Sequence, residues 1–254
     1  MIRVLIVDDS ALVRKILTQE LSRFPDIEVV GSAVDPYAAR DKIVQLNPDV
    51  VTLDIEMPRM DGLTFLEKLM RFFPKPVVVV SSLTPKNSET AIRALALGAV
   101  DVIPKPGSAL SVPDVAERLA HSIRAAASSR VEQRDISDVP RAALPAAGLK
   151  TTDKIITIGA STGGTRAIEH VLLELPADGP GILIVQHMPE QFTGSLAKRL
   201  DGICRMEVRE ARDEDVVIPG LALIAPGGRH MVLDRSCARY FVRTNEDPPV
   251  HFPL

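Results

Sequence analysis

The chain has 254 residues, which is enough for two domains with separate hydrophobic cores. Hydrophobic residues make up 46% and charged residues 25%, an ordinary balance for a soluble protein, and the net charge of −3 gives no basic field for nucleic acid. The N-terminus runs directly into a strand-like segment, no stretch approaches the ~20 apolar residues of a membrane span, and the two cysteines are isolated. We therefore expect a cytoplasmic protein without membrane insertion, disulfide framework or nucleic-acid binding.

The first 125 or so residues alternate between strand-like and helix-like segments. Helical spacing of apolar residues is clear in residues 12–24 and again in residues 112–127. Short runs rich in Val, Ile and Leu, typical of buried strands, cover residues 3–7, 27–31, 49–53, 77–81 and 100–103. This alternation predicts a doubly wound, five-stranded parallel sheet of the flavodoxin-like class.

Acidic residues follow two of these strands. Asp8 and Asp9 come directly after the first strand, and Asp54 comes after the third. Because the carboxyl ends of parallel strands meet at one edge of a sheet, the three carboxylates are expected to converge, where a hard cation such as Mg²⁺ relieves their repulsion. Capping of the helix that starts after Ser10 is an alternative role for one of the first two aspartates, but it does not account for Asp54.

Two further strand ends complete this group of polar residues. Ser81 ends the fourth strand, and Lys105 follows the fifth. A hydroxyl and an ammonium beside a carboxylate–metal cluster suit a phosphoryl group carried on Asp54 as an acyl phosphate. Together, these elements resemble the receiver domain of two-component response regulators: Asp8-Asp9, Asp54-x-x-Met57-Pro58-x-x-Asp61-Gly62, Ser81, Gly98-Ala99 and Lys105-Pro106.

The resemblance implies that a histidine kinase phosphorylates Asp54. It further implies that Mg²⁺ is held by Asp9, Asp54 and the backbone carbonyl of Glu56, with Asp8 acting through water. The same resemblance implies that Ser81 is the switch hydroxyl and that Lys105 is the phosphate partner.

Regular patterning stops between about residues 125 and 150, where small and charged residues show no lasting period. We expect a receiver domain over residues 1–124, a linker over 125–150 and a second domain over 151–254.

The second domain opens with a strand, a tight turn and a helix. A β-branched run from residue 155 ends in Gly159-Ala-Ser161-Thr-Gly163-Gly164-Thr165, and apolar residues at helical spacing follow. Gly159-x-Ser161-x-Gly163 has the small-residue frame of a nucleophile elbow, in which glycines relieve Cβ clashes and the serine hydroxyl projects beside a helix N-terminus that favours an oxyanion. A phosphate-binding or purely structural turn is the alternative.

The next strand-like run, residues 181–186, ends at His187. In a right-handed βαβ unit, Ser161 and His187 lie at the carboxyl ends of neighbouring parallel strands, where an imidazole can take the serine proton. A histidine that only caps the strand end is the alternative. Beyond an amphipathic segment at residues 192–200, residues 216–220 and 223–231 resemble strands joined by glycine turns.

With a receiver in front, the chain resembles CheB-type chemotaxis protein-glutamate methylesterases. The resemblance implies a hydrolytic α/β domain, again doubly wound, that cleaves methyl-glutamate esters on chemoreceptors and deamidates receptor glutamines in sensory adaptation once Asp54 is phosphorylated. Ser161 then attacks the ester, His187 transfers the proton to methanol, and Thr162 and His251 line the pocket. The matching motifs are Gly159-Ala-Ser161-Thr-Gly-Gly-Thr165, Gln186-His187-Met188-Pro189 and Ala225-Pro226-Gly227-Gly228-x-His230-Met231.

The same resemblance leaves the third member of a Ser-His-Asp triad unassigned. The family's aspartate lies in a Met-Gly-x-Asp-Gly stretch, which does not occur in these 254 residues. We therefore expect the C-terminal part of the catalytic domain to be missing, the protein to be monomeric, and the esterase step to use no cofactor. A phospho-switched docking module without turnover is the alternative function, whereas a DNA-binding regulator is disfavoured because no helix-turn-helix pattern is present.

Overall fold

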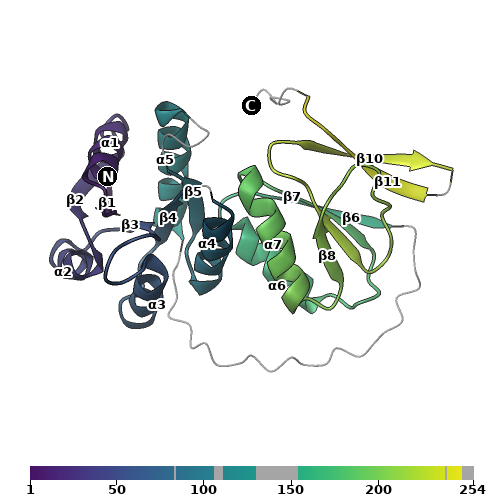
Figure 1. The fold of residues 1–254 in the computed structure, drawn as a ribbon, viewed down its shortest axis with the longest axis horizontal. Helices are drawn as coiled ribbons and strands as arrows, with labels where there is room; N and C mark the ends of the chain where they lie inside the picture. The colour runs from purple at the N-terminus through teal and green to yellow at the C-terminus, as the bar shows by residue number, and fades with distance from the viewer. Residues whose placement is uncertain (83, 106–110, 130–153, 238, 248–254) are drawn as a thin grey trace. The chain divides into compact units, whose positions relative to one another are not determined.

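The computed structural model describes residues 1–82, 84–105, 111–129, 154–237 and 239–247. These residues form two compact units, which we call the first unit (residues up to 129) and the second unit (residues from 154), as Figure 1 shows. The boundary between them lies outside the described residues. Among the described helices, none is both long and apolar enough to cross a membrane.

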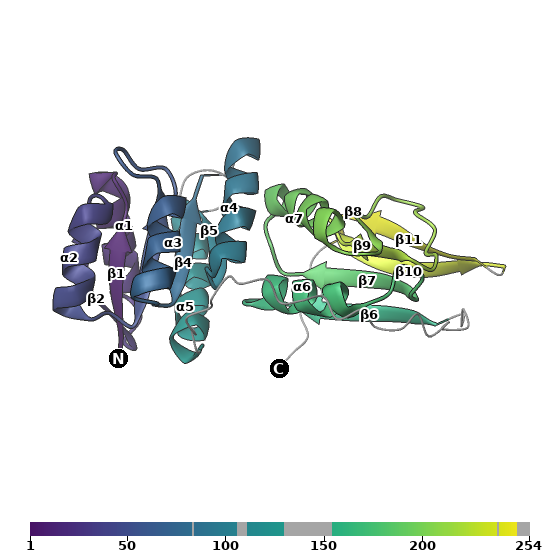
Figure 2. The ribbon, with the colours of Figure 1, turned by 90° about the horizontal axis from the view of Figure 1, so that it is seen from below.

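The first unit is a five-stranded parallel sheet with the strand order β2-β1-β3-β4-β5. Helices α1 and α5 contact each other on one face, and α3 and α4 contact each other on the opposite face (Figures 1 and 2). This arrangement confirms the predicted doubly wound, flavodoxin-like sheet. The elements are β1 (Ile2–Val7), α1 (Ala11–Leu21), β2 (Ile27–Ala33), α2 (Pro36–Leu46), β3 (Val50–Asp54), α3 (Gly62–Phe72), β4 (Val77–Ser81), α4 (Pro85–Leu97), β5 (Asp101–Pro104) and α5 (Val112–Ser128).

The apolar runs of this unit form strands because both faces of the sheet are covered. Every residue of β3 and of β4 is buried, as expected for central strands of a parallel sheet. On the α1–α5 side, Val4 and Ile6 of the sheet belong to one core cluster with Leu17, Leu119 and Ile123 of the helices. The polar residues that follow the strands lie at one edge of this sheet, because the strands are parallel.

Small polar side chains set the starts of several helices. In each case the side-chain oxygen accepts a hydrogen bond from the backbone N–H three residues later, which satisfies one otherwise unpaired donor of the first turn. These N-caps are Ser10, Asp35, Asp61 and Ser111. Because Ser10 caps α1, capping does not explain Asp8 or Asp9, and that alternative interpretation of the acidic pair is wrong.

The second unit is a four-stranded parallel sheet with the strand order β6-β7-β9-β8, joined by an antiparallel hairpin of β10 and β11. Helices α6 and α7 contact each other, and on the other side of the sheet Val242 of the hairpin shares a core cluster with Leu183 and Leu223. The second parallel α/β domain is thus confirmed. Its elements are β6 (Ile155–Ala160), α6 (Gly164–Glu174), β7 (Gly181–Gln186), α7 (Glu190–Ile203), β8 (Glu207–Glu210), β9 (Leu221–Ile224), β10 (His230–Ser236) and β11 (Arg239–Asn245).

One predicted strand of this unit is wrong. Residues 216–220 form no strand: Val216 makes an isolated bridge to Phe241, and the chain then turns at Gly220, whose φ is +81°. The short strand β8 and the hairpin strand β11 were not predicted.

Candidate functional site

The first unit gathers the predicted acidic residues at the carboxyl edge of its sheet. Asp8, Asp9 and Asp54 each offer one carboxylate oxygen, and these atoms all lie within 4.8 Å of one another. Asp8 and Asp54 are buried, whereas Asp9 is exposed. The cluster therefore combines two fixed carboxylates with one that solvent can reach.

Lys105 provides the positive charge of this cluster. Its Nζ lies 2.8 Å from Asp54 Oδ2 and 2.9 Å from Asp8 Oδ2. With one ammonium against three carboxylates, two negative charges remain uncompensated when all groups are ionised. Oxygen ligands, an excess of two charges and access to water are what a hard divalent cation requires, so Asp8, Asp9 and Asp54 fit such an ion.

Burial and the ion pairs act on the pKa values in opposite directions. Burial raises the pKa of Asp54 to about 6, although the hydrogen bond and charge of Lys105 act to lower it. For Lys105, burial disfavours the ammonium, but the contacts with Asp54 and Asp8 outweigh it and the pKa lies above the ordinary value. At neutral pH, Asp54 is therefore an ionised carboxylate that is poorly solvated and held in a fixed position.

Ser81 lies beside this pair. It is fully buried at the end of β4, opposite Pro104 of β5, and its carbonyl accepts a hydrogen bond from the backbone N–H of Lys105 at 2.9 Å. The adjacent Ser82 donates to Glu56 Oε2 at 2.8 Å, and the backbone N–H of Glu56 donates to Asp54 Oδ1 at 3.1 Å. The loops after β3 and β4 are thus connected next to Asp54.

Arg14 is a residue of this site that the sequence reasoning missed. Its Nη1 donates to the main-chain carbonyls of Asp8 and Asp9, at 2.7 Å and 2.9 Å. The guanidinium therefore holds the loop that carries two of the three carboxylates. The available signal was weak: a basic residue in the helix directly after an acidic loop is also common as a solvated surface charge.

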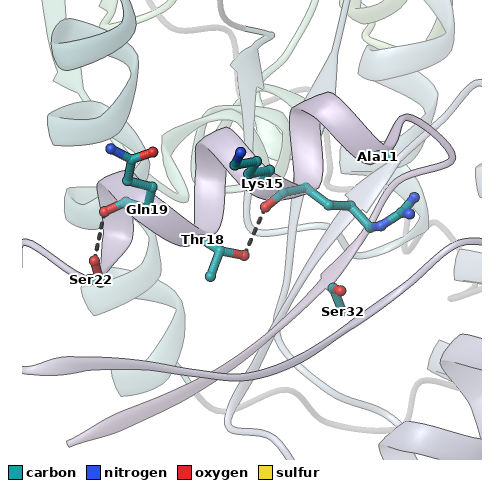
Figure 3. A pocket seen from close by; sticks show the side chains of 7 residues that line it. Ala11, Lys15, Thr18, Gln19, Ser22 and Ser32 are labelled. Carbon is teal, nitrogen blue, oxygen red and sulfur yellow. Dashed lines mark hydrogen bonds between the residues drawn. The ribbon is translucent and has the colours of Figure 1, made fainter.

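A groove of about 460 Å³ lies beside α1 (Figure 3). Two of its hydroxyl groups are paired within the helix, because Thr18 Oγ1 donates to the carbonyl of Arg14 and Ser22 Oγ donates to that of Gln19. Of the residues at the acidic cluster, the groove shares only Arg14, whose Nη1 already donates to the carbonyls of Asp8 and Asp9, and it contains none of the predicted site residues. Its lining consists of Ala11, Arg14, Lys15, Thr18, Gln19, Ser22 and Ser32.

The second unit places Ser161 and His187 at neighbouring strand ends. Strands β6 and β7 pair in parallel with Ala160 opposite Gln186, and the backbone N–H of His187 donates to the carbonyl of Ala160 at 2.9 Å. Ser161 and His187 directly follow these paired residues, so they lie at the same end of two neighbouring strands. Both are exposed.

Helix α6 begins at Gly164, after a short turn that follows Ser161. Its N-cap is Gly163, with φ of +78°, and this residue provides no side-chain hydrogen bond to the first turn. A left-handed φ favours glycine at this position. A Cβ added to Gly159 or to Gly163 would meet nothing within 4 Å, so the expectation that these two glycines relieve a Cβ clash is wrong. Thr162 is partly buried in the same turn.

Two further predictions concern His251 and Glu56. His251, predicted to line the pocket, lies outside the described residues. The metal-binding carbonyl predicted for Glu56 stays a prediction, because only its backbone N–H and its carboxylate are shown to form contacts, with Asp54 and Ser82.

Comparisons with known proteins point to a single family. Residues 4–115 match the model of the response regulator receiver domain, and residues 156–252 match that of the CheB methylesterase. The response regulator domain of Thermotoga maritima CheB is a similar solved structure, 43% identical with a TM-score of 0.47, covering 51% of this chain and 98% of that one.

Relatives that match 98% of this chain support the family assignment. A protein-glutamate methylesterase/protein-glutamine glutaminase of Syntrophus aciditrophicus is 57% identical over 98% of this chain and 74% of its own length. One from Pectobacterium atrosepticum is 54% identical over 98% of this chain and 72% of its own. The chain therefore belongs to the protein-glutamate methylesterase/protein-glutamine glutaminase family, and it carries both the receiver and the CheB methylesterase regions of that family.

Proposed function

We propose that this protein is a phosphorylation-activated hydrolase that cleaves glutamate methyl esters on chemoreceptors and deamidates receptor glutamines during sensory adaptation. The observation that supports the proposal is the register of β6 and β7, in which Ala160 pairs with Gln186, and Ser161 and His187 are the residues that follow them. The names of the relatives support both activities. We propose a receiver from residue 1, a linker up to residue 150 and the esterase domain from 151. The expected receiver boundary at 124 is too early, because α5 continues to Ser128 and Ala126 is buried in the core of the first unit.

In the proposed reaction, Ser161 Oγ attacks the carbonyl carbon of the ester while His187 takes its proton. The tetrahedral intermediate then collapses, and the proton returns from the imidazolium to the departing methanol. The N-terminus of α6 stabilises the oxyanion electrostatically, because its cap contributes no side chain that pairs with the first-turn N–H groups. Water attack on the acyl-enzyme by the same route restores Ser161. For a glutamine substrate, the leaving group is ammonia.

Control of this reaction is assigned to the first unit. Asp54 is the proposed phosphoacceptor, with a chemotaxis histidine kinase as donor. Asp8, Asp9, Asp54 and the carbonyl of Glu56 would hold Mg²⁺, which neutralises charge on the incoming phosphoryl group. After transfer, Lys105 and the hydroxyl of Ser81 pair with the new phosphoryl oxygens, because both already lie at the same strand ends as Asp54.

The proposal is tested by methanol release from methylated receptor membranes. The protein is assayed with and without Mg²⁺ and acetyl phosphate, beside Ser161→Ala and Asp54→Asn. We expect release to rise on phosphorylation, to vanish in Ser161→Ala, and to stay at the unstimulated level in Asp54→Asn.

Each variant isolates one half of the proposal. Methanol release that persists in Ser161→Ala would exclude this serine as the nucleophile, and acyl-phosphate labelling that persists in Asp54→Asn would place the phosphoacceptor elsewhere. A protein that is phosphorylated on Asp54 but releases no methanol would be the docking module without turnover.

A further inference from the structure

Gln186 is a buried polar residue that the proposed reaction does not use. It is the last residue of β7 and is 6% exposed. Because side chains alternate along a strand, it lies on the same face of the sheet as the fully buried Ile182 and Ile184. A polar side chain on this apolar face requires an explanation.

The amide nitrogen of Gln186 contacts both residues of the proposed esterase pair. Nε2 donates to the main-chain carbonyl of Ser161 at 2.9 Å and to that of His187 at 3.4 Å. A side-chain amide has two N–H donors, so a single NH₂ group can serve both carbonyls. The side chain therefore connects the β6–α6 turn to the residue that follows β7.

The small residues of the turn make room for this side chain. A Cβ added to Gly164 would lie 2.3 Å from Gln186 Oε1 and 2.6 Å from the Cβ of Ala160. Among the described residues, nothing pairs with Gln186 Oε1, and burying an unpaired amide oxygen disfavours folding. Packing alone would be better served by an apolar side chain, which leaves the two N–H contacts as the reason for an amide.

We propose that Gln186 is a positioning residue that fixes the distance and orientation between the Ser161 hydroxyl and the His187 imidazole. This inference rests on the proposed function. Gln186 does not touch the substrate; it acts by fixing the backbone of the nucleophile relative to the backbone of the base. A displacement of the order of 1 Å between reacting groups costs roughly 100-fold in rate.

The test compares the rate of covalent labelling of Ser161 by a fluorophosphonate, across a range of pH, in the whole protein. Gln186→Met keeps the length of the side chain but has no N–H donor. We expect its labelling to be roughly 10- to 100-fold slower than that of wild type, and this factor should be the same at every pH. Gln186→Glu regains an O–H donor when its carboxyl is protonated, so its rate relative to wild type should rise as the pH falls. Gln186→Glu also tests the proposal if Gln186→Met does not fold.

Thr193→Val is the matched control for loss of stability. Thr193 is equally deep in the second unit, and the change removes its hydrogen bonds with Glu210 and the N–H of Gly227. We expect Thr193→Val to have a lower unfolding midpoint than wild type, while its Ser161 is labelled at the wild-type rate.

The possible failures are distinguishable. Wild-type labelling in folded Gln186→Met, an equal slowing in Thr193→Val, or a pH-independent ratio for Gln186→Glu would overturn the positioning role. Absence of labelling in the wild type, or labelling that survives in Ser161→Ala, would instead overturn the proposed nucleophile, and the positioning role with it.

Discussion

Burial of Asp54 makes the stability of the first unit depend on pH. Because the pKa rises from 3.8 to about 6 on folding, this group favours the folded state below pH 4, and that contribution is lost as the pH rises through about 6. A shift of this size corresponds to about 3 kcal/mol. Urea unfolding in EDTA should show the free energy of unfolding of wild type falling, relative to Asp54→Asn, between pH 4 and 7. Parallel pH profiles for the two proteins would contradict the raised pKa.

Removal of the Lys105 ammonium should also change the stability of the first unit. Lys105→Met leaves the buried carboxylates of Asp8 and Asp54 without their counter-charge, and breaking a buried ion pair costs about 3 kcal/mol or more. We expect a lower unfolding midpoint in EDTA and a larger rise on adding Mg²⁺ than in wild type, because the cation replaces the lost charge. Lys68→Met, at an exposed lysine of α3, is the control. Equal Mg²⁺ responses in all three proteins would exclude these carboxylates as ligands.

Among the elements, the β6–α6 turn requires two glycines. Gly164 leaves no space for a Cβ, and Gly163 has a positive φ. Gly164→Ala would force a Cβ into Gln186 Oε1 and Ala160, so we expect Ser161 labelling to slow by roughly the same 10- to 100-fold as in Gln186→Met. Gly159→Ala, in the preceding strand, is the matched control, since a Cβ there meets nothing and its φ is not positive. Equal labelling rates in the two alanine variants would show that the space around Gln186 is not needed.

The elements also show which parts of the fold were predictable. The strands of the first unit were found because burial on both faces leaves continuous apolar runs, such as Val77–Ser81. Strand β8 (Glu207–Glu210) was missed because only Val208 of its four residues is buried. Residues 216–220 were overpredicted for the opposite reason: Val216 and Ile218 are apolar but remain 39% and 49% exposed.

The candidate sites also have features that the sequence predicts and features that it does not. Convergence of Asp8, Asp54 and Lys105 follows from parallel topology alone, because every strand of such a sheet ends at the same edge. The contacts of Arg14 and Gln186 could not be predicted, since each joins a side chain to a main-chain carbonyl. Hydrogen bonds of this kind do not require any particular residue type at the accepting position, so the sequence carries no sign of them.

For the whole molecule, the two units should respond differently to a metal ion. All the proposed Mg²⁺ ligands belong to the first unit, and the second contributes none of them. A ligand present at 100 times its Kd stabilises the unit that binds it by about 2.7 kcal/mol. Calorimetry should therefore resolve two unfolding transitions, only one of which moves to higher temperature with Mg²⁺. Asp54→Asn should reduce that shift, whereas Ser161→Ala should retain it. A single transition would instead show that the units unfold together, so that binding energy at Asp54 is transmitted directly to the part of the chain that carries Ser161. An equal shift of two separate transitions would show that the second unit also responds to Mg²⁺.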